Sequence, residues 1–382
     1  MGAISLTARI PKAAPLSSRV LRIGLSSESA PIAPHHIALL LNNGERPTHG
    51  INFGAVLSRT AYRDAVLLPP ELGYLQSGDI IRLDGANGFI RVIYRKSSPH
   101  NVLFLTERCN SRCVMCSQPP REIDDGYLLN DLLEAIPLMA RETPELCITG
   151  GEPTLNFPGV LKLVQSVKEH LPATSLHMLS NGRLFRYLNL AKEIAEVGHP
   201  DFMIGIPLYA DTATQHDFVV QASGAFEETM EGLVNLGRVR QPIEIRFVIH
   251  QQTVDRMVQT ARFIRRNLPF VAHVTLMGIE PMGFARTNWN ALWIDPTEYA
   301  PALEEAITEL RMAGMRTSIY NHPLCLLPRS LWSYARKSIS DWKNIYLPEC
   351  QECAVRTQCA GLFASASIHH SKHIHPLFGG SS

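Results

Sequence analysis

The sequence predicts an α/β fold whose main body is a parallel sheet, preceded by a small β-rich domain and followed by a cysteine-rich region. Short strand patterns broken by turns fill residues 1–98. Over residues 99–314, apolar strands alternate with amphipathic helical patterns. A group of cysteines falls within residues 315–368. We expect the remaining tail, residues 369–382, to be flexible because it is polar and rich in histidine.

The N-terminal region predicts a small β-rich domain with no catalytic constellation. Its strand patterns include "HIALLL" at 36–41 and "DIIRLDGANGFIRVIYR" at 79–95. The second of these contains Asn87-Gly88, a dipeptide typical of tight β-hairpins. We therefore expect an antiparallel hairpin there.

The central region predicts six strands, each followed by a helix. Helical patterns occur at 156–171 and 254–268, where apolar residues fall on one face. Repeated βα units form parallel sheets with right-handed crossovers, and continuous apolar strands fit a sheet whose outer face is covered. The sheet could be open or curled into a partial barrel. The predicted strands are 102–106, 146–150, 175–180, 202–209, 243–250 and 273–280.

Composition narrows the classes of protein. Formal net charge is +1, with 36 Lys+Arg against 35 Asp+Glu, which argues against a nucleic-acid-binding protein. No apolar run is long enough to span a bilayer, and the N-terminus lacks the apolar core of a signal peptide. We therefore expect a cytoplasmic protein. In that compartment, eight cysteines indicate metal binding rather than disulfides.

Unusual polar residues follow the predicted strands at the point where each strand ends. In parallel α/β folds, ligands bind at this edge because loops and helix N-termini converge there. The first strand leads directly into a cysteine-rich loop. The other strand ends carry "TGGEP" (149–153), "SNG" (180–182), "PLYAD" (207–211), His250 and "MGIEP" (277–281).

The loop after the first strand carries three cysteines, Cys109, Cys113 and Cys116, in the spacing Cys-x3-Cys-x2-Cys. Three thiolates can hold three corners of a 4Fe–4S cluster and leave one iron open. An open coordination position is typical of a catalytic metal centre rather than a structural one. The alternative is a zinc loop completed by a distant His or Cys.

This cysteine loop, followed by "GGEP", resembles the radical S-adenosylmethionine (SAM) superfamily, and the resemblance covers about residues 100–290. It implies a partial (β/α)6 barrel, a 4Fe–4S cluster on the three loop cysteines and SAM bound to the open iron. Gly150 and Gly151 would let the backbone approach SAM, Glu152 would pair with the SAM ammonium group, and Pro153 completes the motif. Taken alone, "GGEP" is also compatible with an ordinary strand-to-helix turn.

Four further residues are SAM-binding candidates, three of them through the same resemblance. Met115 occupies the place of an aromatic residue that packs near adenine in the family, and its polarisable side chain could serve similarly. Ser180 and Asn181 match a position near the ribose or methionine moiety, although they could equally form a turn or a helix cap. Glu280 is one of few acids at a strand end and is a candidate contact for SAM or substrate.

A second group of cysteines comprises Cys325, Cys350, Cys353 and Cys359. Four thiols make a closed site, which predicts a second metal centre with complete protein ligation. The group resembles the auxiliary-cluster regions, SPASM or twitch, of peptide-modifying radical SAM enzymes, but lacks the seven cysteines of a full SPASM set. A second 4Fe–4S cluster fits best, and a four-thiolate zinc site is the alternative.

Longer phrases, among them "NVLFLTERCNSRCVMCSQPP" and "LPECQEC", resemble the C-type maturases (HxsC) of the His-Xaa-Ser peptide-modification system. This resemblance implies an oxidoreductase that cleaves SAM to a 5′-deoxyadenosyl radical and modifies a ribosomally made precursor peptide by hydrogen abstraction. It also implies a partner maturase and an external electron donor. The alternatives are an accessory maturase that binds peptide or partner with little activity alone, and a radical SAM enzyme acting on a small molecule or RNA.

Overall fold

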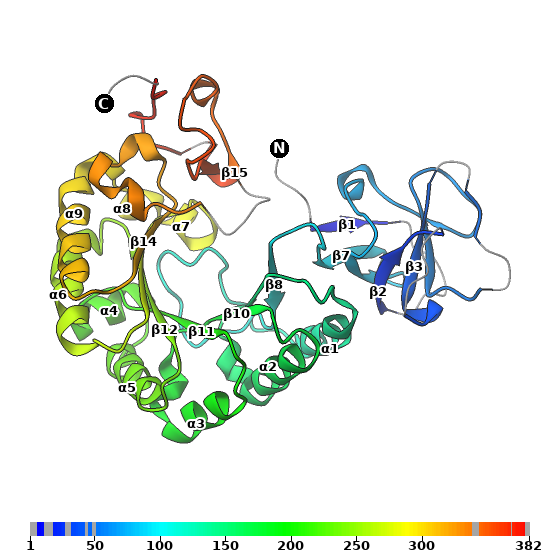
Figure 1. Cartoon of the computed structure of the whole chain (residues 1–382), viewed down its shortest axis with the longest axis horizontal. Coiled ribbons are helices and arrows are strands. Elements are labelled where there is room, and N and C mark those ends of the chain that lie inside the picture. Colours follow the sequence, from blue (N-terminus) through cyan, green and yellow to red (C-terminus); the bar gives the residue numbers. More distant parts are fainter. Residues whose placement is uncertain are drawn as a thin grey trace.

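The structure is a computed structural model, and it confirms the α/β fold. It describes residues 6–10, 18–26, 32–42, 45–47, 51–337, 344–367 and 369–378. Residues 1–5 at the beginning of the chain and residues 379–382 of the predicted tail therefore lie outside the described residues. Figure 1 shows a curved sheet with helices along its outer side, a separate β domain at the N-terminal end and a small C-terminal region.

The N-terminal domain is one mixed sheet with the strand order β1-β7-β6-β2-β3-β4-β5. Strands β6 and β7 pair antiparallel across Asn87-Gly88, so the predicted hairpin is confirmed. Side chains from the strands of this sheet pack into a hydrophobic core that belongs to the N-terminal domain. It includes Leu21, Leu40 and Ile81. The strands are β1 Thr7–Arg9, β2 Arg19–Gly24, β3 Ile37–Leu41, β4 Ala55–Ser58, β5 Val66–Leu67, β6 Ile80–Asp84 and β7 Phe89–Tyr94.

The central sheet is parallel throughout and runs in the order of the sequence, from β8 to β14. All six predicted strands are present. A seventh, β14, pairs with β13, so the sheet extends past residue 314, where the sequence analysis ended the barrel. The strands are β8 His100–Phe104, β9 Glu145–Thr149, β10 Ser175–Leu179, β11 Phe202–Pro207, β12 Ile243–Ile249, β13 His273–Gly278 and β14 Thr317–Tyr320.

Helices cover the convex face of this sheet (Figure 1). Their apolar faces pack on side chains such as Ile204, Ile245 and Leu276, which leaves the concave face free for other residues. None of the helices within the described ranges is both long and apolar enough to cross a membrane. They are α1 Tyr127–Ala135, α2 Phe157–His170, α3 Leu188–Glu196, α4 Ala213–Val220, α5 Ala225–Arg238, α6 Met257–Asn267, α7 Gly283–Thr287, α8 Trp289–Leu292 and α9 Pro296–Met312.

The concave face of the sheet carries a polar network centred on Glu244. His273 Nδ1 lies 3.2 Å from one oxygen of Glu244, and Arg246 Nη1 donates to the other at 2.5 Å. Burial alone would raise the pKa of Glu244, but the hydrogen bond from His273 and the charge of Arg246 outweigh it and bring that pKa to about 2. The concave face is therefore charged and hydrogen-bonded, a feature that the apolar strand patterns did not predict.

The N-terminal domain is joined to the barrel by a shared core and a buried ion pair. Val20, Ile93 and Tyr94 belong to the same apolar cluster as the barrel residues. Asp131 of α1 accepts hydrogen bonds from Arg82 and, at 2.7 Å, from Arg91. Removing residues 1–98 would expose part of the barrel core, so deletion of this domain is not a clean test of its role in binding.

Replacing Asp131 by alanine should destabilise the chain by about 3 kcal/mol, because two enclosed guanidinium groups lose their counter-charge. Urea unfolding followed by fluorescence measures the free energy of unfolding. Glu142→Ala is the matched control, since its pair with Lys96 joins the same two parts of the chain but is exposed, at 3.7 Å. We expect it to cost less than about 1 kcal/mol. An equal decrease in the free energy of unfolding in Asp131→Ala and Glu142→Ala would contradict the prediction.

The C-terminal region contains a short two-stranded sheet, β15 Asn344–Ile345 and β16 Leu362–Phe363. The sequence analysis predicted a flexible tail beyond residue 368. In the structure, the Ala354 N–H donates to the Leu377 carbonyl at 2.8 Å, and the ring of His369 lies 5.4 Å from that of Trp289. Residues 369–378 thus lie against the cysteine region and the barrel.

Candidate functional site

The loop that carries Cys109, Cys113 and Cys116 begins at the carboxyl end of β8. Asp125, which lies between this loop and α1, holds its first residues. Its carboxylate accepts from Thr106 Oγ1 at 2.7 Å and from the Glu107 N–H at 2.6 Å. Asp125 is buried, and the sequence analysis did not single it out, because an acid in a polar stretch has no distinctive spacing.

Gly150 and Gly151 lie against this loop. The Gly151 N–H donates to the Thr106 carbonyl at 2.7 Å, and a Cβ on Gly151 would stand 2.2 Å from the Arg108 carbonyl oxygen. A Cβ on Gly150 would meet the Thr106 oxygen at 2.4 Å. Only glycine permits so close an approach. The two glycines, which were predicted to let the backbone approach SAM, also make room for the cysteine loop.

Glu152 is wholly buried and ties the second strand end to the third. One of its oxygens accepts from Ser180 Oγ at 2.8 Å, and the other accepts from the Asn181 N–H at 2.6 Å. Thr154 adds two further hydrogen bonds through its N–H and hydroxyl. Burial raises the pKa of Glu152 despite these donors. The predicted partner of the SAM ammonium group therefore already has protein partners, and so does Ser180.

Asn181 and Arg183 connect the third strand end to the middle of the cysteine loop. Asn181 Nδ2 donates to Asn110 Oδ1 at 2.6 Å, and Arg183 Nη1 donates to the Asn110 carbonyl at 2.6 Å. Arg183 Nε is held in turn by Glu228 at 2.6 Å. Arg183 directly follows "SNG", and this position next to a predicted site motif is the signal by which it could have been found.

The far side of the loop packs on α4 and α7. The Val114 N–H donates to the Val219 carbonyl at 2.9 Å, and the Phe284 N–H donates to the Cys116 carbonyl at 2.8 Å. Met115 is buried in an apolar cluster with Tyr209 and Val219. The residue predicted to lie near adenine thus forms part of the wall between the loop and α4.

The three loop thiols lie close enough for each charge to affect the next. Burial raises the pKa of Cys109 to about 11 and raises that of Cys113 further, and the charge of Cys116 adds to both effects. Three such thiols ionise together only if a cation balances them. In the described ranges, no three His, Cys, Asp or Glu side chains converge tightly enough to hold a single metal ion. Three cysteine thiolates on one loop are a donor set that can hold an iron–sulfur cluster with one open iron.

Two residues singled out at strand ends, Glu280 and His250, and His216 of α4 contact other parts of the protein. Glu280 accepts a hydrogen bond from Ser365 Oγ at 3.4 Å. His216 is buried and stacks on Tyr209, with ring centroids 5.9 Å apart, and burial lowers its pKa to about 4. His250 is also buried, and burial lowers its pKa to about 4 as well. Both histidines are therefore neutral at pH 7.

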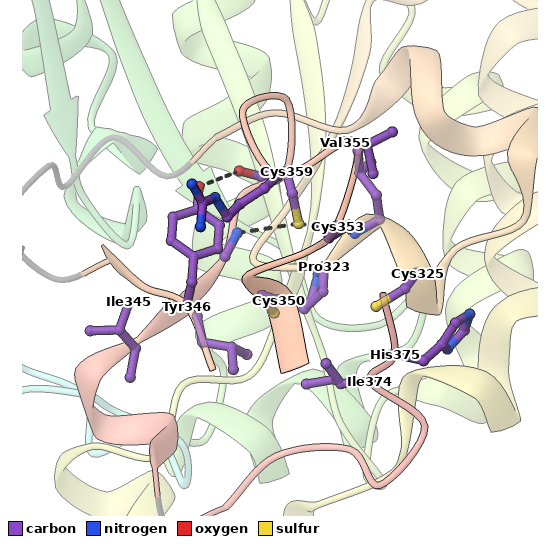
Figure 2. A pocket seen from close by; sticks show the side chains of 14 residues that line it. Pro323, Cys325, Ile345, Tyr346, Cys350, Cys353, Val355, Cys359, Ile374 and His375 are labelled. Atoms are coloured by element: carbon purple, nitrogen blue, oxygen red, sulfur yellow. Dashed lines mark hydrogen bonds between the residues drawn. The ribbon is translucent and has the colours of Figure 1, made fainter. Parts of the chain in front are cut away.

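The second cysteine group lines one cavity. Cys325, Cys350, Cys353 and Cys359 surround it together with apolar side chains such as Val355, as Figure 2 shows. Backbone N–H groups point at their sulfurs: Leu324 donates to Cys359 Sγ at 3.3 Å. Such bonds stabilise thiolates. Four thiolates can hold either an iron–sulfur cluster or a single zinc ion.

Comparison with known proteins gives a family match and distant relatives. Residues 103–264 match the model of the Radical SAM superfamily. The chain is 25% identical to a probable dual-specificity RNA methyltransferase RlmN of Desulfitobacterium hafniense, over 49% of this chain and 57% of the relative. It is also 25% identical to molybdenum cofactor biosynthesis protein 1 of Bos taurus, over 49% of this chain and 29% of the relative.

Among solved structures, the chain resembles Streptococcus suis SuiB bound to S-adenosylmethionine. The TM-score is 0.47 at 15% identity, over 59% of this chain and 51% of that one. The match to the Desulfitobacterium hafniense relative covers little more than half of that protein's length. The matched segment contains the cysteine loop, the GGEP motif and the third strand end, whose contacts are described above. The central region of this chain, residues 103–264, therefore matches the Radical SAM superfamily, a superfamily of enzymes.

Proposed function

We propose that this chain is a radical SAM enzyme that modifies a ribosomally made peptide of the His-Xaa-Ser type. The observation that carries the proposal is the joining of three thiols to the GGEP motif at one edge of the sheet. The Glu152 N–H donates to the Arg108 carbonyl at 2.8 Å, one residue before Cys109. The loop and the motif thus form one unit, built around three cysteines at the mouth of the barrel.

In this proposal, Cys109, Cys113 and Cys116 hold a 4Fe–4S cluster, and SAM occupies the fourth iron. When bound, the cluster and SAM supply a one-electron cleavage that yields a radical able to abstract hydrogen. The chain's own residues orient and enclose this centre. Arg183 and Asp125 fix the loop backbone, and the glycines of GGEP bring the second strand end against it.

Some residues of the predicted SAM set have a different role in this proposal. Glu152 and Ser180 act as positioning residues, because the Glu152 carboxylate accepts hydrogen bonds from Ser180 Oγ and from the Asn181 N–H. The partly exposed backbone of Gly150 and Gly151 remains the candidate contact for the SAM amino group. Met115 and Tyr209 form an apolar wall that excludes water behind the loop.

Two features support a peptide as the substrate class. The formal net charge of +1 gives the chain no general attraction for RNA. Val102 of the edge strand β8 faces the concave side and is 44% exposed, so this side of the barrel is open to solvent where a chain segment could enter. A partner maturase and an external electron donor belong to the same proposal.

The substrate is tested by anaerobic incubation with SAM and a strong reductant. We expect 5′-deoxyadenosine from the reconstituted protein and a mass change in a His-Xaa-Ser precursor peptide, measured by mass spectrometry. RNA and the peptide should be offered in parallel, since RNA methyltransferases are among the relatives of this chain. Modification of RNA alone would overturn the peptide proposal while leaving the radical SAM assignment intact. Modification of the peptide only when the partner maturase is present would favour an accessory role.

The C-terminal cysteines are proposed to hold a second 4Fe–4S cluster. Anaerobic counting should give about eight irons per chain, falling to about four in the double variant Cys350→Ala, Cys353→Ala. The double variant should keep the loop cluster because these thiols lie in a separate cavity. Zinc in the wild-type chain, with about four irons that do not change in the variant, would show that the second site is a zinc site.

A further inference from the structure

The final described segment of the chain lies on the C-terminal cysteine cavity. Ile374 and His375 line this cavity together with the four thiols, and Figure 2 shows His375 on the side of Cys325. The Ala354 N–H, from the turn between two of the cysteines, donates to the Leu377 carbonyl at 2.8 Å. The tail and the cysteine turn are therefore hydrogen-bonded along their backbones.

Two backbone groups of this tail segment point at the sulfurs. The Leu377 N–H donates to Cys353 Sγ at 3.5 Å. The backbone of His375 hydrogen-bonds the Cys325 thiol, which opposes the effect of burial on the pKa of that thiol. The Cys359 thiol accepts hydrogen bonds from residues outside the tail. The N–H groups of Leu324 and Gly361 donate to Cys359 Sγ at 3.3 and 3.5 Å. The tail thus completes a set of N–H···S bonds to thiols of the site.

The segment is anchored just before it reaches the cavity. Ser371 is buried and hydrogen-bonds the side chain of Asp295, the residue that caps the N-terminus of α9. His369 lies against Trp289, and His370 Nδ1 contacts the Ala366 carbonyl at 2.9 Å. The contacts at 369–371 fix the start of the segment. The His373 N–H also donates to Ser371 Oγ at 3.0 Å, so removal of residues 372–378 takes one hydrogen bond from Ser371 and leaves its bond to Asp295.

We propose that residues 372–378 are a structural part of the C-terminal metal site, closing its cavity and donating hydrogen bonds to Cys325 and Cys353. The inference rests on the proposed function, because it takes this site to hold an iron–sulfur cluster. Hydrogen bonds to ligating sulfurs and restricted solvent access both control how firmly a cluster is held and at what potential it is reduced. The histidine-rich tail is therefore a lid with fixed contacts rather than a free extension.

The first test measures iron release in a chain that carries Cys109→Ala, Cys113→Ala and Cys116→Ala, so that all bound iron belongs to the C-terminal site. A version ending at Ser371 should release iron to a chelator about tenfold faster than the full chain. A version ending at Phe378 is the matched control and should release iron at the full-length rate. If the triple variant does not fold, the same truncations in the wild-type chain should accelerate one of two release phases.

The second test isolates one hydrogen bond. Leu377→Pro removes the N–H that meets Cys353, and should shift the reduction potential of the C-terminal cluster to a more negative value, because that bond favours the more negatively charged reduced state. Phe378→Pro is the control, since Phe378 donates no backbone hydrogen bond in the part of the chain that the structure describes. The potential should be unchanged in this variant.

The outcomes distinguish the role of residues 372–378 from the presence of the second cluster. Iron that is released at the same rate from the Ser371-terminated chain, with an unchanged potential in Leu377→Pro, overturns the role of the tail and leaves the cluster in place. A full-length triple variant without iron overturns both the second cluster and this inference. Formation of 5′-deoxyadenosine by the wild-type chain tests the loop cluster independently of either result.

Discussion

Replacing Cys113 by alanine should reduce 5′-deoxyadenosine formation to the level of the protein-free blank and remove about four irons per chain. Cys113 is the middle thiol of the loop, and its charge interacts with those of both Cys109 and Cys116. Two thiols cannot hold a cluster with a single open iron, so neither cluster nor SAM cleavage should survive. Anaerobic reconstitution, iron and sulfide counting and chromatographic detection of the nucleoside measure the effect.

Cys147→Ala is the matched control for this experiment. Cys147 is a buried thiol of β9, and its sulfur has a hydrogen-bond contact with the Ile148 carbonyl rather than with the loop. Its loss should leave the iron count and the SAM cleavage unchanged. A Cys113→Ala protein that still makes 5′-deoxyadenosine at the wild-type rate would remove the basis for the proposed site.

Replacing Gly151 by alanine should lower SAM cleavage about a hundredfold without removing any thiol, since displacing reactive groups by about 1 Å has effects of that size. The added Cβ would stand 2.2 Å from the Arg108 carbonyl oxygen and 3.1 Å from Cys109 Cβ. Both contacts involve the backbone or the first atom of a side chain, so the cysteine loop itself must move. Overpacking of this kind also costs about 1–3 kcal/mol of stability.

The control for Gly151→Ala is Gly126→Ala. Gly126 begins α1 with φ at −56°, and a Cβ there would meet its nearest atom, Asp124 Oδ1, at 3.6 Å. The side chain added is the same and the space is sufficient, so activity should be unchanged. Iron content and nucleoside formation measured on both variants distinguish a displaced loop from a general effect of losing glycine. Full activity in Gly151→Ala would show that the close packing is not needed for function.

The sequence was most informative about elements that repeat. Apolar runs such as 243–250 alternated with helical patterns, and this rhythm was sufficient to predict the parallel sheet and its order. It did not reveal where the sheet ends, because β14 is only four residues long and stands next to the second cysteine group. Its place was decided by pairing with β13, a contact between distant residues.

The sequence also indicated which residues belong to the site, because cysteine spacing and the GGEP motif are local features. It could not indicate how they contact one another. Gly150, Gly151 and Glu152 were predicted as SAM contacts, and the structure adds that all three also pack against or hydrogen-bond neighbouring loops. Arg183 and Asp125 were missed because their importance lies in contacts across the fold rather than in any spacing.

The sequence by itself determined the fold class, the position of the cysteine loop after the first strand and the presence of a second group of thiols. Only the tertiary structure decided that the GGEP motif packs against the loop, that Glu244 forms a charged network on the concave face, and that Ile374 and His375 line the C-terminal cavity. The physical reason is the separation along the chain between the residues that interact. Periodicity and motif spacing report on neighbours along the chain, whereas close packing, burial and N–H···S bonds depend on segments brought together only by folding.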